Sequence, residues 1–298
     1  FQKFTMKSIY QTNFKNQKVL VRVDFNVPLN SEKIVTDNSR IIAAKKTIDK
    51  IINDGGTAIL MSHLGRPEGK DPELSLIHIV KTVESVLEKP VLFTNQVIGE
   101  KTTEIVKNSK PGQIVLIENL RYYPQEEAGN NSFAKELSKL AGSYVNDAFG
   151  SAHRAHASTA IITENFPENK CFGALLASEI KSLEKVLGDS KKPVTAVIGG
   201  AKVSSKITVI ENILDKIDHM IIGGGMTFTF VKALGGKIGD SICEDDKMEL
   251  ALEILKIAKE KGVQIHIPVD VIAADAFSND ANTQIVDVRE IPDGWQGL

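Results

Sequence analysis

The sequence predicts an α/β protein with two doubly wound parallel-sheet domains joined by a helix. Strand-like apolar runs alternate with helix-like runs from residue 18 onward, and the alternation restarts at Val194 after the polar stretch 188–193. The length of 298 residues is enough for two domains, each with its own core. We therefore expect an N-terminal domain at 1–175, a joining helix and linker at 176–193, and a second domain at 194–298.

Composition and charge are those of a soluble globular protein. Apolar residues make up 42% and charged residues 25%, with a net charge of −2. The chain has no overall positive charge that would favour binding to nucleic acid. No apolar run approaches the roughly 18 residues of a membrane span. Cys171 and Cys243 have no metal-ligand spacing and indicate a reducing compartment. We expect a cytoplasmic protein that binds neither nucleic acid nor membrane.

The first strand, within 18–28, has an unusual polar face. Apolar and polar residues alternate along it: Val21, Val23, Phe25 and Val27 with Arg22, Asp24 and Asn26. Pro28 suits the end of a strand because it cannot donate to a central ladder. Two interpretations stay open. The strand is either a sheet edge with one wet face or a strand that delivers polar groups to a ligand at its carboxyl end.

The other elements of the first domain follow in order. A helix is expected over 40–53, after capping residues at 36–39 and before Gly55-Gly56. Further strands are expected at 57–62, 90–94, 113–117 and 144–149. Further helices are expected at 75–88, 101–109 and 131–141, and the joining helix at 175–187.

The second domain repeats the pattern. We expect strands at 194–198, 219–222 and 263–268, with one more candidate at 284–288. A helix over 203–215 is expected to carry Lys206 in its first turn, another helix follows Gly223-Gly224-Gly225, and a long helix spans 244–261.

Arginine is scarce and unevenly placed. Of 36 basic residues six are arginines, and five of these lie at strand ends or helix starts within the first 154 residues. They are Arg22, Arg40, Arg66, Arg121 and Arg154. Their rigid fork suits carboxylate and phosphate, and ligands of parallel sheets sit outside the carboxyl ends of the strands. Together with Asp24, Asn26 and His63 they indicate a site for a small anion.

Histidines are weaker signals. His63, alone, is more often a strand-end residue satisfied by the protein than a ligand contact. Metal binding by His153 and His156 is not favoured, because no cysteine or carboxylate completes a ligand set. We expect no metal site made by protein residues.

Two glycine-rich turns follow strands of the second domain, at 199–200 and 223–225. Amides at a helix start with glycines beside them can cradle phosphate, and Lys202 and Lys206 stand four residues apart across the first turn. Neither turn matches a Walker A loop or a dinucleotide fingerprint, so a purely structural turn stays an equal alternative. With an anion site in one half and these turns in the other, the residues favour a transferase between two anions.

Six segments resemble motifs of phosphoglycerate kinase, in the order of that family. They are VRVDFNVP at 21–28, SHLGRP at 62–67, ENLR at 118–121, NDAFGSAHR at 146–154, GGAKV at 199–203 and IGGGM at 222–226. The resemblance implies two Rossmann-like domains and reversible transfer of the γ-phosphoryl of MgATP to the carboxylate of 3-phosphoglycerate. The products are 1,3-bisphosphoglycerate and ADP, and the enzyme is expected to be a monomer.

The resemblance also implies site residues. The triose-phosphate site would contain Asp24, Phe25, Asn26, Arg40, His63, Leu64, Gly65, Arg66, Arg121 and Arg154. The nucleotide site would contain Gly200, Ala201, Lys202, Lys206, Gly224, Ile242 and Gly297. Arg40 and Lys202 would act in catalysis, with Arg40 meeting the reacting carboxylate. Asp24 is expected to accept a substrate hydroxyl or to orient a neighbouring arginine, and Arg22 to support the site without touching the ligand.

The chain departs from the family in one respect. The family continues beyond Leu298 for roughly another quarter of its length, so we expect the second domain to be incomplete and its sheet to lack strands. Two other readings stay open: an anion-binding module without activity, and a nicotinamide-dependent oxidoreductase, against which the missing dinucleotide fingerprint counts.

Overall fold

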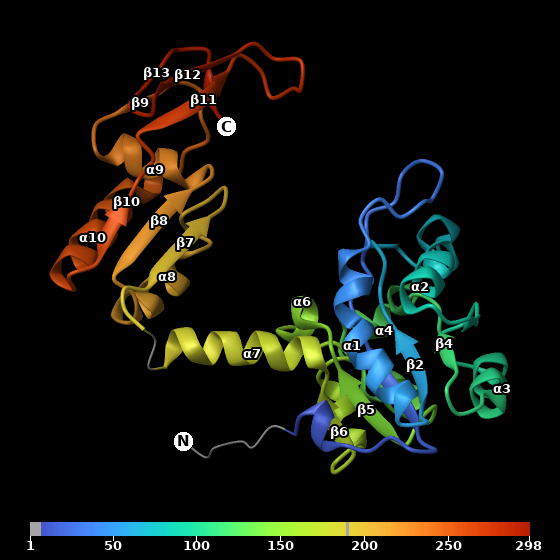
Figure 1. The fold of residues 1–298 in the computed structure, drawn as a ribbon. Helices are drawn as coiled ribbons and strands as arrows, with labels where there is room; N and C mark the ends of the chain where they lie inside the picture. The colour runs from blue at the N-terminus through green and yellow to red at the C-terminus, as the bar shows by residue number, and fades with distance from the viewer. Residues whose placement is uncertain (1–6, 189–190) are drawn as a thin grey trace. The chain divides into compact units, whose positions relative to one another are not determined.

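The computed structural model describes residues 7–188 and 191–298, and the chain divides into two compact units, Phe1–Ser182 and Leu183–Leu298 (Figure 1). The helix α7, Ala174–Leu187, runs through the point of division. Among the described residues, no helix is long and apolar enough to cross a membrane.

The first unit is built on a six-stranded sheet in the order β3-β4-β2-β1-β5-β6, with every neighbouring pair parallel. The strands are β1 Lys18–Arg22, β2 Thr57–Met61, β3 Val91–Phe93, β4 Ile114–Leu116, β5 Ser143–Asn146 and β6 Lys170–Phe172. Because β1 pairs with β2 on one side and β5 on the other, it lies inside the sheet. The edge-strand interpretation is therefore wrong: Arg22 on the polar face is only 1% exposed.

Helices cover both faces of this sheet. They are α1 Ser39–Asn53, α2 Val80–Leu87, α3 Glu100–Asn108, α4 Pro124–Glu127, α5 Asn131–Ser138 and α6 Phe149–Ala152. Short 3-10 helices are Ile9–Gln11, Pro72–Leu74, Leu76–Ile79, Leu120–Tyr122 and Ile161–Asn165. Alternate strand residues enter two cores: Leu60 of β2 packs on the side of α1 and α2, whereas Ile59 packs on the side of α3 and α5. Burial on both faces explains the near-continuous apolar strands.

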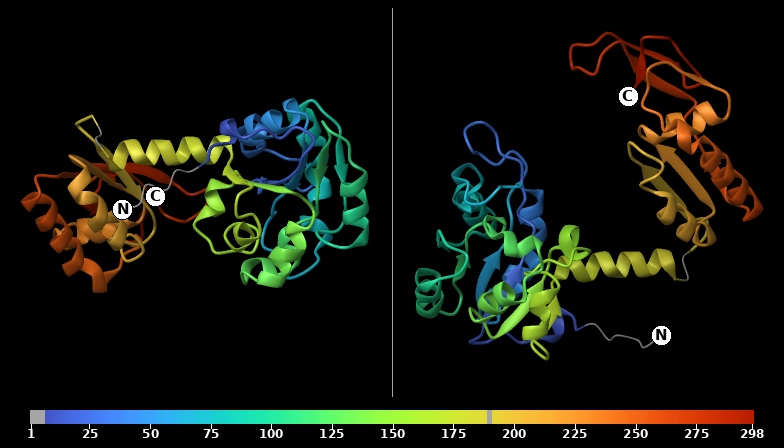
Figure 2. Two further views of the ribbon diagram at one scale, coloured as in Figure 1. Left: turned by 90° about the horizontal axis from the view of Figure 1, so that it is seen from below. Right: turned by 180° about the vertical axis from the view of Figure 1, so that it is seen from behind.

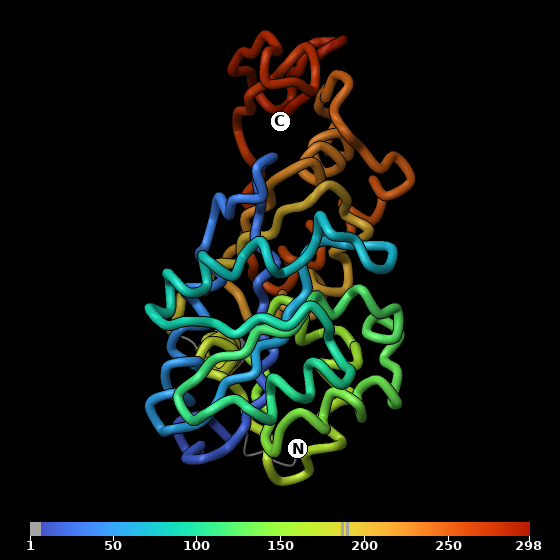
Figure 3. The backbone as a smooth tube through the Cα atoms, turned by 90° about the vertical axis from the view of Figure 1, so that its right-hand side faces the viewer, coloured from blue at the N-terminus to red at the C-terminus, as the bar shows by residue number. Residues whose placement is uncertain are grey.

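The segment between β1 and α1 stands out from the sheet as a loop (Figure 3, blue). A small antiparallel bridge joins Leu29 to Val35, and Thr36 N donates to Pro28 O at 3.0 Å. Asp37 Oδ1 accepts from Ser39 N at 2.8 Å, where α1 begins. This start places Arg40 in the first turn of α1, as expected.

The second unit combines a parallel sheet, an antiparallel sheet and a two-stranded parallel pair (Figures 1 and 2). The parallel sheet has the order β10-β8-β7, with β7 Thr195–Gly199, β8 His219–Gly223 and β10 Gln264–His266. Its helices are α8 Ile207–Ile213, α9 Met226–Ala233 and α10 Met248–Glu260, with 3-10 turns at Leu214–Lys216 and Asp245–Lys247. The remaining strands are β9 Lys237–Ile238, β11 Asp270–Ala274, β12 Thr283–Asp287, β13 Glu290–Ile291 and β14 Gln296–Gly297. Strands β12, β11 and β14 form an antiparallel sheet, and β13 pairs with β9.

Several expected elements differ from the structure. Helix α8 begins at Ile207, so Lys206 precedes the helix instead of lying in its first turn. Glu244 explains the later start, because its carboxylate accepts from Ser204 N and Oγ at 3.0 and 2.5 Å and holds 203–206 as a turn. Strand β5 ends at Asn146, and the short helix α6 begins at Phe149 where a strand end and loop were expected.

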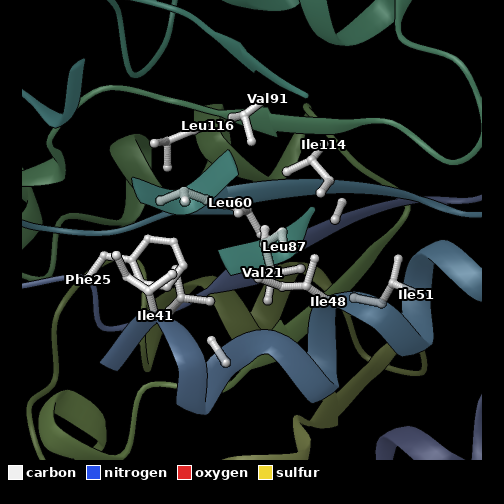
Figure 4. Close-up of a cluster of buried hydrophobic side chains, with 14 of the residues drawn as sticks. Val21, Phe25, Ile41, Ile48, Ile51, Leu60, Leu87, Val91, Ile114 and Leu116 are labelled. Carbon is white, nitrogen blue, oxygen red and sulfur yellow. The ribbon is translucent and has the colours of Figure 1, made fainter. Parts of the chain in front are cut away.

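The core between α1 and the sheet is fully buried. Figure 4 shows Ile41, Ile48 and Ile51 of α1 lying against Val21 and Leu60 of the strands. All five side chains are completely buried. Protein interiors are close-packed, so the loss of even a few methyl groups from a buried core lowers the free energy of unfolding.

We predict that Ile48→Ala lowers the free energy of unfolding by about 2–5 kcal/mol, because it leaves a cavity in this core. The matched control is Ile42→Ala in the same helix, where the side chain is 53% exposed and the change should stay within about 0.5 kcal/mol. Urea denaturation followed by circular dichroism measures both. Equal losses in the two variants would contradict the assignment of the core face.

Candidate active site

A polar cavity of about 340 Å³ opens in the first unit among residues that follow the carboxyl ends of its strands. Its lining residues are Asp24, Asn26, Arg40, His63, Gly65, Arg66, Arg121, Gly150, Ser151 and Arg154. Four of these are arginines, and Asp24 is the one carboxylate in the lining. Such a lining suits an anion with more than one negative group.

Hydrogen bonds between neighbouring strand exits hold the cavity wall. Asn26 Oδ1 accepts from Gly65 N at 2.9 Å, and Ser62 Oγ accepts from Phe25 N at 2.8 Å, so the segments after β1 and β2 are joined twice. Gly65 has φ +62°, and a Cβ there would lie 2.8 Å from the Leu74 side chain. A side chain at position 65 would be both strained and crowded.

His63 is neutral and has a defined tautomer. Its Nδ1 lies 3.3 Å from the Arg22 guanidinium nitrogen Nη2. Since arginine can only donate, Nδ1 accepts and the proton sits on Nε2. Burial lowers the pKa of His63 from 6.5 to about 2, and the positive charges of Arg22, Arg121 and Arg40 act in the same direction. The imidazole is therefore a hydrogen-bond donor in the cavity wall and not a cation.

Two arginines of the cavity are held by carboxylates. Arg40 Nη1 lies 2.5 Å from Asp24 Oδ2, with the Arg40 side chain 49% exposed. The better-buried Arg121 donates from Nη1 to Gly65 O at 2.7 Å and pairs through Nη2 with Glu127 Oε1 at 3.0 Å. Burial lowers the pKa of Arg121, Glu127 opposes that shift, and Arg154 adds to it. The expectation that Asp24 orients a neighbouring arginine matches this geometry.

The other two arginines of the cavity, Arg66 and Arg154, lack such carboxylate partners in the described part of the chain. Arg66 and Arg154 are exposed, and neither forms an ion pair within residues 7–188 and 191–298. Their charges are therefore available to neutralise a bound anion at the cavity rim.

The structure gathers most of the residues expected at the triose site. Eight of the ten line the cavity, whereas the side chains of Phe25 and Leu64 are buried in the core. Those two contribute backbone: Leu64 N and O both bond to the Asn119 carboxamide. Gly150 and Ser151 also line the cavity and were not singled out, although both stand in the NDAFGSAHR motif.

In the second unit the two glycine turns pack backbone to backbone. Gly224 has φ +68°, and a Cβ there would lie 3.0 Å from Gly200 N. Met226 N donates to Gly200 O at 2.8 Å, which joins the turns after β7 and β8. A Cβ on Gly225 would lie 2.6 Å from Ile242 Cγ2 and 3.3 Å from Ala201 O.

The remaining residues expected at the nucleotide site lie around these turns or further along the chain. A Cβ on Gly200 would lie 3.4 Å from Lys206 Cε, and Lys202 is exposed on the loop after β7. Gly297 N donates at 2.9 Å to Oγ of Ser241, the residue before Ile242. A Cβ on Gly297 would lie 2.2 Å from the Phe228 ring, so this position requires glycine for packing.

An arginine-lined anion cavity on one α/β unit and paired glycine turns on the other define the class of phosphotransferases. Residues 9–298 match the family model described as phosphoglycerate kinase. The chain belongs to the phosphoglycerate kinase family.

Individual proteins similar to this chain belong to the same family. Phosphoglycerate kinase of Porphyromonas gingivalis is 48% identical, over 98% of this chain and 75% of the relative. That of Synechococcus elongatus is 47% identical, over 99% of this chain and 74% of the relative. The structure of phosphoglycerate kinase from Coxiella burnetii aligns with a TM-score of 0.80 at 37% identity, covering 98% of this chain and 73% of that one. The crystal structure of phosphoglycerate kinase from Pyrococcus horikoshii aligns with a TM-score of 0.84 at 26% identity. The alignment covers 98% of this chain and 75% of that one.

These findings confirm three predictions from the sequence. The fold is α/β with parallel sheets, as in the phosphoglycerate kinase structures. The chain is an enzyme, a kinase that carries out the ATP-dependent phosphoryl transfer of glycolysis. The readings as an inert anion-binding module and as an oxidoreductase are not favoured.

We predict that His63 makes the protein less stable in mild acid. The unfolded chain binds a proton at this residue below about pH 6.5, whereas the folded chain does not until about pH 2. Stability contributed by neutral His63 is thus complete above pH 6.5 and declines as pH falls, by about 2 kcal/mol at pH 5. His63→Gln should remove this part of the difference in unfolding free energy between pH 8 and pH 5, as measured with urea. An identical pH dependence in both proteins would refute the assignment.

Proposed function

We propose that this chain moves the γ-phosphoryl of MgATP reversibly to the carboxylate of 3-phosphoglycerate, with the triose bound in the arginine-lined cavity. The observation that carries the assignment is the composition of that cavity: four arginines, one carboxylate and a neutral histidine donor. A phosphorylated carboxylic acid brings two anionic ends and a hydroxyl, which this set of donors and acceptors complements.

The four arginines divide between the two ends of the triose. Arg66 and Arg154, which are exposed and have no ion-pair partner in the described part of the chain, would bind the phosphate with the help of Arg121. Arg40, held by Asp24 at 2.5 Å, would meet the reacting carboxylate. Asp24 has a second oxygen, which would accept the substrate hydroxyl. Asn26, Gly65, Phe25 and Leu64 would set the backbone around the ligand.

Phosphoryl transfer to a carboxylate needs no general base, because the acceptor is ionised at neutral pH. Donor and acceptor are both anions, so the enzyme has to neutralise their repulsion and align them. Arg40 supplies charge at the acceptor, and we assign the corresponding role at the donor to Lys202. Mg²⁺ would arrive as part of the nucleotide substrate and neutralise charge between its phosphates.

The nucleotide would bind at the turns after β7 and β8. Gly200, Ala201 and Gly224 allow the close approach of a ligand to the backbone, and Lys202 and Lys206 would reach the phosphates. Ile242 and Gly297 would lie at the adenosine. This gives the chain a triose-binding part at 1–175, a joining helix and linker at 176–193, and a nucleotide-binding part at 194–298.

We also infer a monomer that acts in the cytoplasm. Membership of the phosphoglycerate kinase family is what leads us to expect a monomer. Cys171 and Cys243 are free thiols, which persist in a reducing compartment. The net charge of −2 gives no support for nucleic-acid or anionic-membrane partners.

A coupled assay for ATP-dependent formation of 1,3-bisphosphoglycerate tests the proposal, with wild-type turnover expected on the order of 1–100 s⁻¹. We predict that Arg40→Ala lowers kcat on the order of 10²–10³-fold and weakens 3-phosphoglycerate binding far less, because its charge acts mainly in the transition state. Arg289→Ala is the control, because Arg289 does not line the cavity, and it should leave kcat unchanged. Equal losses in kcat and binding would show that Arg40 only binds the ground state.

We further predict that the two substrates respond to different variants. Arg66→Ala or Arg154→Ala should raise the Kd for 3-phosphoglycerate about 10- to 100-fold, the size expected for a charge-assisted hydrogen bond, and leave nucleotide binding unchanged. Lys206→Ala should raise the Kd for ADP and leave the triose Kd unchanged. Isothermal calorimetry measures the triose Kd and the nucleotide Kd of each variant. A shift of the triose Kd in Lys206→Ala would count against the two-site assignment.

A further inference from the structure

Three buried polar side chains behind the cavity have no part in the proposed chemistry. Arg22, Ser158 and Glu126 are 1%, 0% and 1% exposed. Arg22 Nε donates to Ser158 Oγ at 2.9 Å. Ser158 Oγ donates to Glu126 Oε1 at 2.5 Å, and Ser158 N to Glu126 Oε2 at 2.9 Å. The serine hydroxyl thus stands between the two buried charges.

The other end of this chain of hydrogen bonds reaches the cavity. The Arg22 guanidinium lies 3.3 Å from His63 Nδ1 and donates to Val23 O at 2.5 Å. His63 lines the cavity, whereas Arg22, Ser158 and Glu126 do not. His63 is therefore the member of this series of hydrogen bonds that reaches the cavity.

The direction of every hydrogen bond in the series is determined. An arginine only donates and a carboxylate only accepts, so the hydroxyl of Ser158 accepts from Arg22 and gives its one proton to Glu126. At the far side Arg22 donates to His63, which leaves the imidazole proton on Nε2. Reversal at any member would leave a buried donor facing a donor, which is strongly unfavourable in a dry interior.

Burying an arginine and a glutamate is expensive unless the charges are paired and hydrogen-bonded. Here the two charges do not touch, and apolar residues of similar volume would serve packing as well. The arrangement instead gives Arg22 a fixed orientation, since its Nε is held by Ser158 and its Nη1 by Val23 O. An arginine held in this way presents Nη2 to His63 at one angle.

We propose that Glu126, Ser158 and Arg22 are positioning residues that hold His63 as an Nε2–H donor aimed at the bound triose anion. The proposal rests on the triose site assigned above. It adds three residues that never touch the substrate and through which the enzyme recognises an acceptor group on it. Without them His63 would be free to rotate or change tautomer and would present a lone pair to an anion.

The direct test is the protonation state of His63 in the wild-type enzyme, read from the imidazole ¹⁵N resonances of labelled protein. The proposal requires Nε2–H as the single form between pH 6 and 8. A proton on Nδ1, or a mixture of the two tautomers, would overturn it, and this measurement needs no variant to fold.

The variant test compares Ser158→Ala with Ser143→Ala. Both remove a buried serine hydroxyl. The Ser158 hydroxyl accepts from Arg22 and donates to Glu126, whereas the Ser143 hydroxyl donates to Gln17 Oε1 away from the cavity. Ser158→Ala should mix the His63 tautomers and raise the Kd for 3-phosphoglycerate about tenfold, the size of one oriented hydrogen bond to a charged group. Ser143→Ala should change neither, and Ser158→Thr should restore both. An unchanged tautomer and Kd in Ser158→Ala would overturn the proposal.

Glu126→Gln is the second variant if Ser158→Ala fails to fold, and the same two readouts apply. Failure of the broader assignment is distinguishable. If wild-type protein does not bind 3-phosphoglycerate, the triose site itself is wrong. If wild-type binds and His63→Gln loses affinity while Ser158→Ala and Glu126→Gln do not, only the positioning role is wrong.

Discussion

The repulsion among arginines crowded at one edge of a sheet is the constraint on which the first unit depends. Five guanidinium groups gather at or just behind a cavity of about 340 Å³. Nearby carboxylates neutralise two of these arginines: Asp24 pairs with Arg40, and Glu127 pairs with Arg121. Glu126 balances Arg22 through the Ser158 hydroxyl. His63 is neutral, first because burial lowers its pKa and second because the neighbouring arginines act in the same direction. The charge at the rim remains uncompensated, and the anionic substrate proposed for this cavity would balance it.

The proposed anion sites of the two units are built by different means. In the first, side chains from neighbouring strand exits do the work, and hydrogen bonds such as Asn26 to Gly65 keep those exits in register. In the second, the two glycine turns pack backbone to backbone: a Cβ on Gly224 would lie 3.0 Å from Gly200 N. Side chains discriminate shape and charge, whereas backbone amides suit the repetitive phosphates of a nucleotide. The division follows from where glycine and arginine stand in the chain.

Much of this arrangement could be predicted from the sequence, because strands β1, β2 and β4 are apolar runs that end in polar motifs. The central position of β1 could not, since the alternation of Arg22 with Val21 and Val23 is equally typical of a wet edge. Long-range contacts explain the other misses. Glu126 lies in a polar run of the sequence that resembles solvated surface. In the structure it is buried, and its carboxylate accepts from Ser158, 32 residues further along the chain. The late start of α8 depends on Glu244, 40 residues beyond Ser204. Strands β6, β9, β13 and β14 have two or three residues each and are set by pairing, not by pattern.

The exposed arginines at the rim have a consequence for the kinetics of encounter. Unpaired guanidinium groups attract an approaching triose phosphate over about one Debye length, roughly 8 Å at physiological ionic strength. In the proposed triose site, Arg66 and Arg154 would therefore make capture of the substrate sensitive to salt. The His63 donor, buried and uncharged, acts only at contact and is indifferent to salt. Capture and recognition in this cavity thus belong to different residues, and ionic strength separates them.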